Sequence, residues 1–445
     1  MLIISFVQFI ICIITAILAW RILKSGRPSL LAITVLGFVA LDSLGLSFAP
    51  YFPLERLPYI ENPVFLIRSI PPALYLRQCL SHWIFLTTAV ILLLQERKWP
   101  IKEGIRKIQN PSLWALFFFV FGIVLSIKYY LIGPGIEILR DTRLSFFSTG
   151  DAVTHRSQGS LMAGLGQGAY LASLGAQLFF PLASILALQG KRSLRKSTYL
   201  LSLSISFVFA FQARQKGLLL IVGLMYLLIY LASTSKSLTL HKIRKIALVI
   251  LVLAVSGAFL LYMVNFGLRP GAAIGSVFYR VFFVPAATET NYFVVFPDKI
   301  SFRGFSNCFS IPLGKIVRYD DATIYDVAIA ALGLGFSSNA SFLAVAWSGK
   351  GYLAVILVSL IYCFLHFFID RWLRKVHIKI ALYSYAITVP TIIILVSAAF
   401  IGYMNWGGII IPIVLIALSQ LSRKNLVKRS SDINYFNFKK AIWKK

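Results

Sequence analysis

The sequence predicts an all-α integral membrane protein, a bundle of about 11 transmembrane helices with one large extracytoplasmic loop region. Hydrophobic residues make up 58% of the 445 residues, charged residues make up 13%, and the mean hydropathy is +0.81. A soluble globular chain carries about 25% charged residues. Apolar runs of about 20 residues, the length that crosses a bilayer, recur along most of the chain.

The apolar runs, taken in order, give the predicted crossings, with shorter runs allowed. They are residues 2–20, 29–48, 79–95, 113–132, 164–188, 198–211, 217–232, 246–264, 351–368, 380–401 and 407–421. The chain then divides into 1–264 with helices 1–8 and a notable outer loop at 133–163, the large outer loop region 265–350, helices 9–11 in 351–421, and the basic tail 422–445.

Lys and Arg gather in every second connection, and this pattern orients the helices. Short cytoplasmic loops of membrane proteins hold an excess of Lys and Arg. Alternate connections and the tail together hold 28 of the 44 Lys and Arg. We therefore predict that the N-terminus is outside and that the C-terminal tail is cytoplasmic, where it contacts anionic membrane lipids. The net charge of +29 is spread between apolar runs, which argues against a nucleic-acid partner.

Segment 265–350 is too polar to sit in lipid, and we predict that it forms the working face. Arg269 and Arg280 stand in it among aromatic residues and carboxylates. The predicted outer connections and adjoining helix ends hold 11 Arg and only five Lys, although orientation needs cations on the inner side. Arg grips phosphate through two parallel hydrogen bonds, so these arginines indicate a lipid pyrophosphate ligand. Pairing with acids of the same face is the alternative interpretation.

Four arginines stand out from the others. Arg140 and Arg143 belong to the predicted outer loop ILRDTRLSFFSTGDAVTHRSQG, and Arg280 follows an apolar turn in VFYRVFFVP. Arg214 lies in the ARQKG link between two short predicted spans. Charge near the membrane is costly and usually functional, so we interpret these four as binding residues rather than as structural ion pairs.

A general base for a sugar hydroxyl must be a carboxylate or an imidazole on the same face. His155 is the histidine of the predicted outer loops. Glu289, nine residues after Arg280, and Asp151 are the carboxylate candidates. A solvated loop carboxylate is the alternative interpretation of either acid.

Three further patterns have structural interpretations. Asp42 and Arg77 lie in the outer halves or ends of neighbouring predicted helices, which predicts an ion pair. Residues 327–347 are apolar but contain several Gly and Ser, so we predict a re-entrant or surface helix packed on the bundle. The chain has neither Cys/His metal spacing nor a phosphate-binding glycine loop, and we predict no metal site.

Together these patterns resemble the Wzy-type polysaccharide polymerases, which polymerise O-antigen and exopolysaccharide repeat units in bacterial cytoplasmic membranes. The resemblance covers roughly residues 133–368. It rests on the outer loop 140–159, ARQKGLLLIVGL, RPGAAIGSVFYRVFFVPAATETNYFVVFP, and SSNASFLAVAWSGKGYLAVILVSLIY with its Asn339. That family is related in fold to the membrane glycosyltransferases of the GT-C type.

The resemblance implies inverting glycosyl transfer without metal or other cofactor. A growing glycan would leave undecaprenyl pyrophosphate for a sugar hydroxyl on the next lipid-linked unit, with a chain-length regulator and a flippase of the same pathway as partners. On this basis we expect Arg214 and Arg280 to clamp the pyrophosphate, with Arg143 assisting. We expect His155 or Glu289 to orient the acceptor.

Two other functions remain as alternatives. An O-antigen-type ligase would use the same donor with a different acceptor, and the sequence does not separate it from a polymerase. A lipid-linked oligosaccharide flippase or other transporter would place charges near the middle of the membrane and break its helices. The predicted helix centres are almost free of ionisable residues, which favours the enzyme.

Overall fold

The computed structural model describes residues 1–25, 29–51, 71–96, 107–132, 169–190, 192–212, 216–234, 256, 259–260, 263, 267–305, 327, 329–331, 340–395 and 407–421. These residues form helices joined by turns, and no strand occurs among them. The predicted all-α membrane bundle is therefore confirmed at the level of its class.

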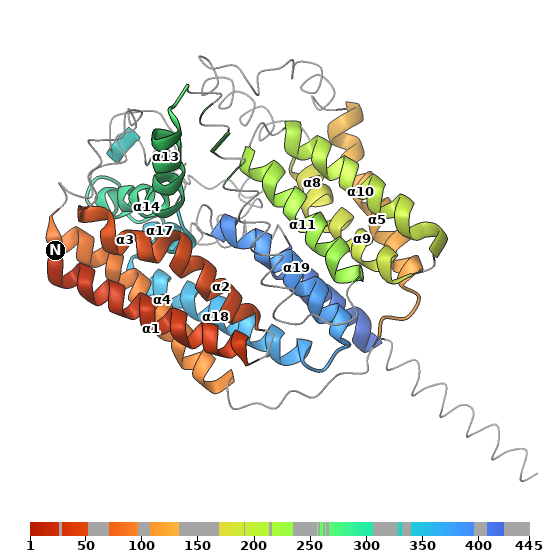
Figure 1. Ribbon diagram of the computed structural model, residues 1–445, viewed down its shortest axis with the longest axis horizontal. Coiled ribbons are helices and arrows are strands. Elements are labelled where there is room, and N and C mark those ends of the chain that lie inside the picture. Colours follow the sequence, from red (N-terminus) through yellow and green to blue (C-terminus); the bar gives the residue numbers. More distant parts are fainter. Residues whose placement is uncertain are drawn as a thin grey trace, which may run out of the picture.

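The helices form two groups that lie side by side (Figure 1). The first contains α1 (Leu2–Lys24), α2 (Leu30–Phe38), α3 (Leu44–Phe48), α4 (Pro72–Glu96) and α18 (Tyr352–Leu373). The second contains α5 (Pro111–Ile127), α8 (Ala169–Leu174), α9 (Phe180–Gln189), α10 (Arg192–Gln212) and α11 (Lys216–Thr234). Helix α19 (Ile378–Leu395) packs against both α2 and α11 and so joins the groups.

Three short helices cover one end of the first group (Figure 1). They are α13 (Pro270–Phe282), α14 (Val284–Val295) and α17 (Phe342–Lys350). Helix α14 packs against α3, α4 and α17, and α17 packs against α18. Part of the predicted loop region 265–350 is therefore a helical layer fixed to the bundle.

The predicted number of 11 crossings is wrong for the described part of the chain. Six helices there are long and apolar enough to span a membrane, or seven if α13 and α14, which meet at a bend of 45°, form one span. Three other predicted crossings contain shorter apolar helices among the described residues, at Ile221–Thr234, Ile378–Ile392 and Ile410–Leu421. Most of the predicted crossing 246–264 lies outside the described residues.

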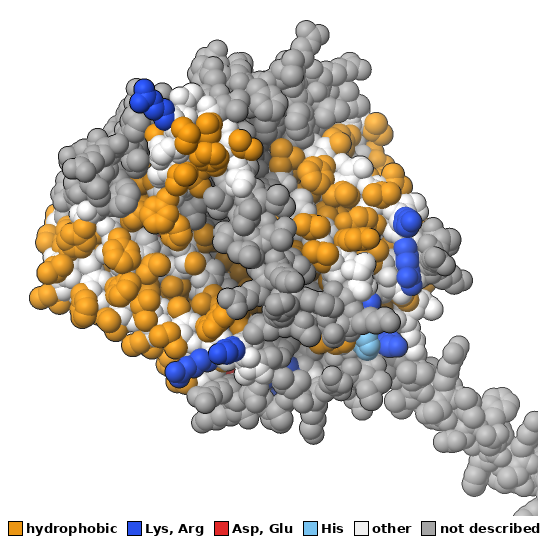
Figure 2. Space-filling view, viewed as in Figure 1, with side chains coloured by type: hydrophobic (Ala, Val, Ile, Leu, Met, Phe, Trp, Pro, Cys, Tyr) orange, Lys and Arg blue, Asp and Glu red, His pale blue; other side chains and the backbone are white. Residues whose placement is uncertain are grey.

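Helix α1 presents polar and small side chains to the protein and large apolar ones outward. Its buried residues include Ser5, Gln8, Cys12 and Thr15, whereas most of its large apolar side chains are exposed. Hydrophobic side chains likewise cover much of the visible surface, and the Lys and Arg in view lie near its edges (Figure 2). This reversal of a soluble protein's pattern is expected where lipid surrounds the bundle, because small and polar residues pack helix against helix there.

One end of the first group is fastened by buried charge. The Asp370 carboxylate of α18 accepts hydrogen bonds from the backbone N–H groups of Leu30 at 2.6 Å and Leu31 at 3.0 Å. These donors open α2 and have no partner within their own helix. Glu96, at the end of α4, accepts from Arg374 and from Ser29 Oγ. The predicted basic loops that follow α4 and α18 therefore begin at the same end of the bundle, as the charge pattern predicts.

The opposite end is closed by contacts with α13 and α14. Leu46, Tyr75 and Cys79 pack with Tyr279 and Phe283 in a buried apolar cluster. Gly45 makes the approach possible, because a Cβ built on it would lie 1.5 Å from the carbonyl oxygen of Phe282. Helix α13 thus rests directly on the backbone of α3.

The predicted re-entrant or surface helix at 327–347 is described only in part. The described portion that is helical over several turns, α17, begins at Phe342, and its residues 342–349 are all buried. Trp347 donates its indole N–H to the carbonyl of Phe296 at 3.0 Å. This helix is therefore packed within the protein.

Candidate functional site

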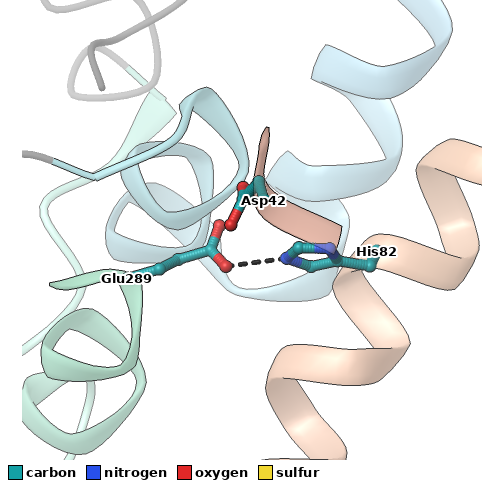
Figure 3. A group of neighbouring side chains, drawn as sticks. All are labelled: Asp42, His82 and Glu289. Atoms are coloured by element: carbon teal, nitrogen blue, oxygen red, sulfur yellow. Dashed lines mark hydrogen bonds and ion pairs between the residues drawn. The ribbon is translucent and has the colours of Figure 1, made fainter. Parts of the chain in front are cut away.

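Three buried ionisable side chains from three separate elements meet where α14 packs on the first helix group (Figure 3). Asp42 comes from a π-helical turn, Val39–Ser43, that joins α2 to α3; His82 comes from α4, and Glu289 comes from α14. All three side chains are 0% exposed, and their candidate ligand atoms lie within 4.8 Å of one another. We refer to Asp42, His82 and Glu289 as the buried triad.

His82 lies well inside α4. His82 is 10 residues from Pro72 and 14 from Glu96, which places it about 15 Å and 21 Å from the two ends of α4 at 1.5 Å per residue. The π-helical turn adds a residue to the helical path beside Asp42, and such turns occur frequently at functional sites. Ionisable groups at this depth are expensive, and they are a functional hypothesis by default.

Glu289 is the most heavily bonded member of the triad. Its Oε2 accepts from His82 Nε2 at 2.7 Å and from Gln78 Nε2 at 2.9 Å, and its Oε1 accepts from the Ser341 hydroxyl. Gln78 is held in turn by Thr290, which donates to Gln78 Oε1 at 2.8 Å. These contacts fasten α14 to α4 and to the start of α17.

His82 is oriented from its other ring nitrogen. Nδ1 lies 2.7 Å from Ser43 Oγ, which accepts from Gln8 Nε2 at 3.0 Å. The indole N–H of Trp83 donates to Gln8 Oε1 at 2.5 Å, which turns the amide nitrogen of Gln8 toward Ser43. Because a hydroxyl both donates and accepts, Ser43 suits either neutral tautomer of His82.

Asp42 differs from its two neighbours. Neither oxygen of its carboxylate accepts a hydrogen bond from a described residue, although both are buried. The group points toward Glu289 (Figure 3). Buried polar groups in proteins are nearly always hydrogen-bonded, so an unsatisfied carboxylate at this position requires an explanation.

The structure corrects two interpretations of single residues. Asp42 does not pair with Arg77; the described ion pair of Arg77 is with Asp298 at 3.7 Å, near the surface. Glu289 is not a solvated loop carboxylate, because it lies at the centre of the buried network. The prediction that helix centres are almost free of ionisable residues has one exception in α4, where His82 lies 10 residues from one end and 14 from the other.

The other predicted site residues are only partly described. Arg269 precedes α13 and is exposed, and Arg280 lies on α13, with its side chain outside the described part. Helix α13 therefore carries both described positions of the predicted pyrophosphate site, next to the helix that carries Glu289. The remaining predicted residues are outside the described residues: Arg140, Arg143, His155, Arg214 and Asn339.

Sequence reasoning missed Asp42 and His82 as partners of Glu289. Both lie inside predicted helices, where the sequence predicts an ion pair for Asp42 and no role for His82. The signal that identifies them is their position, because an ionisable residue well inside an apolar span usually has a functional role. Their convergence on Glu289 depends on contacts between residues 207 or more positions apart.

No protein-family model, curated protein or solved structure matches this chain. The function is therefore inferred from the fold and from the chemistry of the side chains. They define a class, namely an all-α membrane protein with a polar centre buried among its helices. Two carboxylates and an imidazole at this centre can exchange protons or hold a cation.

Proposed function

We propose that the protein is a membrane glycosyltransferase that polymerises undecaprenyl-pyrophosphate-linked oligosaccharide units on the outer face of the bacterial cytoplasmic membrane. The observation that carries the proposal is the anchoring of α13, whose sequence brings Arg269 and Arg280 to the end of the bundle. Helix α14 continues from α13 and is fixed through Glu289 to α4 and α17. A cation-bearing helix held in this way is suited to fixed binding of an anion.

The chemistry needs fixed cations more than a proton donor. The acceptor oxygen forms a bond to the anomeric carbon of the donor sugar while the bond from that carbon to the pyrophosphate oxygen breaks. The electron pair leaves with undecaprenyl pyrophosphate, and the acceptor proton passes to a base. Arginines preorganised where water is excluded stabilise the charge that develops on the leaving group.

Glu289 and His82 are the described pair that can receive the acceptor proton. A carboxylate hydrogen-bonded to an imidazole is a recurrent arrangement for general base catalysis. Both side chains are fully buried, at the contact between α4 and α14. His155, the other predicted base, lies outside the described residues.

Purified protein in liposomes, supplied with radiolabelled lipid-linked repeat units, tests the proposal. A ladder of products that grows by one repeat unit at a time is the expected result. Transfer of the glycan to a different acceptor in a single step would identify a ligase instead. The proposed enzymatic activity would be overturned if no new glycosidic bond formed although the protein was folded and the lipid-linked donor and acceptor were both present.

A lipid-linked oligosaccharide transporter is the second candidate, and the buried triad favours it. Ionisable groups buried in a helix bundle beside a bent helix pair are a feature of transporters. The same liposomes distinguish the two functions. A transporter moves the labelled lipid between leaflets without forming a glycosidic bond.

A further inference from the structure

We propose that Asp42, His82 and Glu289 bind one divalent metal ion, with Mn²⁺ and Zn²⁺ as the ions that match the donor atoms. The proposal goes beyond glycosyl transfer and does not depend on it. It departs from the sequence prediction, which found no metal-ligand spacing because the three donors come from distant parts of the chain.

The donor set fits this class of metal ion. One imidazole nitrogen and two carboxylates suit first-row transition ions, whereas Mg²⁺ and Ca²⁺ favour oxygen alone. Metal bonds of about 2.1 Å separate two donors on one ion by about 3 to 4.2 Å, depending on the angle. The candidate ligand atoms all lie within 4.8 Å of one another, so small side-chain movements bring them to one ion.

The unsatisfied carboxylate of Asp42 is the independent observation that points to a cation. Both of its oxygens are buried without a hydrogen-bond donor among the described residues, and the carboxylate faces Glu289. Burying a charge costs several kcal/mol unless an opposite charge compensates it. The described ion pairs give neither Asp42 nor Glu289 a Lys or Arg partner. A divalent ion between the two carboxylates would supply the missing charge.

The surrounding residues fit the proposal as well. A metal-binding histidine usually donates its second ring N–H to an oxygen, which fixes the ring and its tautomer. Ser43 Oγ lies 2.7 Å from His82 Nδ1, and Gln8 holds Ser43 in place. On metal binding, Nδ1–H would donate to Ser43, and Nε2 would exchange its hydrogen bond with Glu289 for a bond to the metal.

A metal at the triad would join the turn containing Asp42 to α4 and α14. Glu289 would then be a metal ligand rather than a free base, and the polymerase proposal would depend on its arginines. The two proposals fail separately, because metal binding is measured without glycan substrate and chain growth is measured with it.

Metal analysis of the full-length protein in detergent is the test. The protein is purified without chelator, and its Mn and Zn contents are measured by mass spectrometry. It is then stripped with chelator, and its Tm is followed as Mn²⁺, Zn²⁺ or Mg²⁺ is added. We expect about one bound ion per chain and a Tm that rises with Mn²⁺ or Zn²⁺ and not with Mg²⁺, since ligands that bind the folded state stabilise it.

Variants assign the ion to the triad. Asp42→Asn and Glu289→Gln should each weaken metal affinity by tenfold or more. Ser43→Ala, which leaves all three donors in place, should weaken it by about 10- to 100-fold. Asp298→Asn, which alters an exposed carboxylate, should leave affinity unchanged. Wild-type protein that retains no metal and shows no Tm shift overturns the proposal whether or not the variants fold. Equal binding by wild type and Asp42→Asn also overturns it.

Discussion

At the residue scale, the surroundings of a side chain decide its chemistry. Glu289 sits in the sequence ATETNYF, which reads as a polar loop, yet its carboxylate accepts hydrogen bonds from His82, Gln78 and Ser341. Asp42 occupies a similarly buried position with no such donor among the described residues. Two acids of the same charge therefore differ in what they can still bind.

The arginine hypothesis makes a prediction at this scale. Arg280→Lys keeps the positive charge but loses the planar group that forms two parallel hydrogen bonds to a phosphate. We expect chain growth on lipid-linked repeat units to fall at least about tenfold, a loss of about 1.4 kcal/mol of transition-state stabilisation, while expression and Tm stay unchanged.

Arg77→Lys is the matched control, because its guanidinium forms only the surface pair with Asp298 that the structure describes. We expect this variant to polymerise normally. If the Arg280→Lys protein extended chains at the wild-type rate, the predicted clamp would not involve Arg280.

At the element scale, the layer of α13, α14 and α17 is fixed by close approach and by buried polar contacts. Gly45 lets the end of α13 touch α3, and the hydrogen bonds of Glu289 tie α14 to α4. Neither contact follows from helix propensity. Each depends on which helices become neighbours.

Gly45→Ala tests the first contact. The added Cβ would lie 1.5 Å from the Phe282 carbonyl oxygen, so α13 must move. We expect a loss of about 1–3 kcal/mol, the usual cost of overpacking, seen as a lower Tm in detergent. Gly271→Ala, on the same α13 and with nothing within 4 Å of the new Cβ, should be neutral or slightly stabilising. Equal Tm values for the two variants would contradict this packing.

The opposite end of the bundle gives a second prediction at this scale. Arg374 and Glu96 form a pair whose side chains are 7% and 1% exposed. Arg374→Ala removes this guanidinium from a buried carboxylate, and we expect a loss of about 3–5 kcal/mol in stability.

Arg77→Ala provides the comparison for Arg374→Ala, since its pair with Asp298 is 37% and 57% exposed. An exposed pair contributes only about 0–1 kcal/mol. Thermal unfolding of both variants in the same detergent measures the difference. A small effect of Arg374→Ala would mean that water reaches this end of the bundle.

At the scale of the whole molecule, the proposed function depends on which side of the membrane holds α13 and α14. The described helices place the ends of α4 and α18 together, and the α13–α14 layer lies at the other end of the first group. The charge pattern then predicts that this layer faces outward.

Cysteine labelling tests the sidedness. Ser301→Cys and Lys375→Cys introduce exposed thiols near opposite ends of the bundle, in a chain whose Cys308 is replaced and whose Cys12, Cys79 and Cys363 are buried. We expect a membrane-impermeant maleimide to label Ser301→Cys in intact spheroplasts and Lys375→Cys only after permeabilisation. The opposite result would place the predicted working face in the cytosol and end the polymerase proposal.

The sequence by itself determined the class of the protein, because hydropathy and the alternation of basic loops act locally and can be read from any stretch of chain. It also offered Glu289 as a carboxylate candidate, with a solvated loop rather than a buried network as the alternative. The number of spanning helices and the partners of Glu289 were decided by tertiary structure. Asp42 and His82 reach Glu289 only after three distant elements pack together, and the burial that gives these groups their chemistry does not exist until that packing is complete.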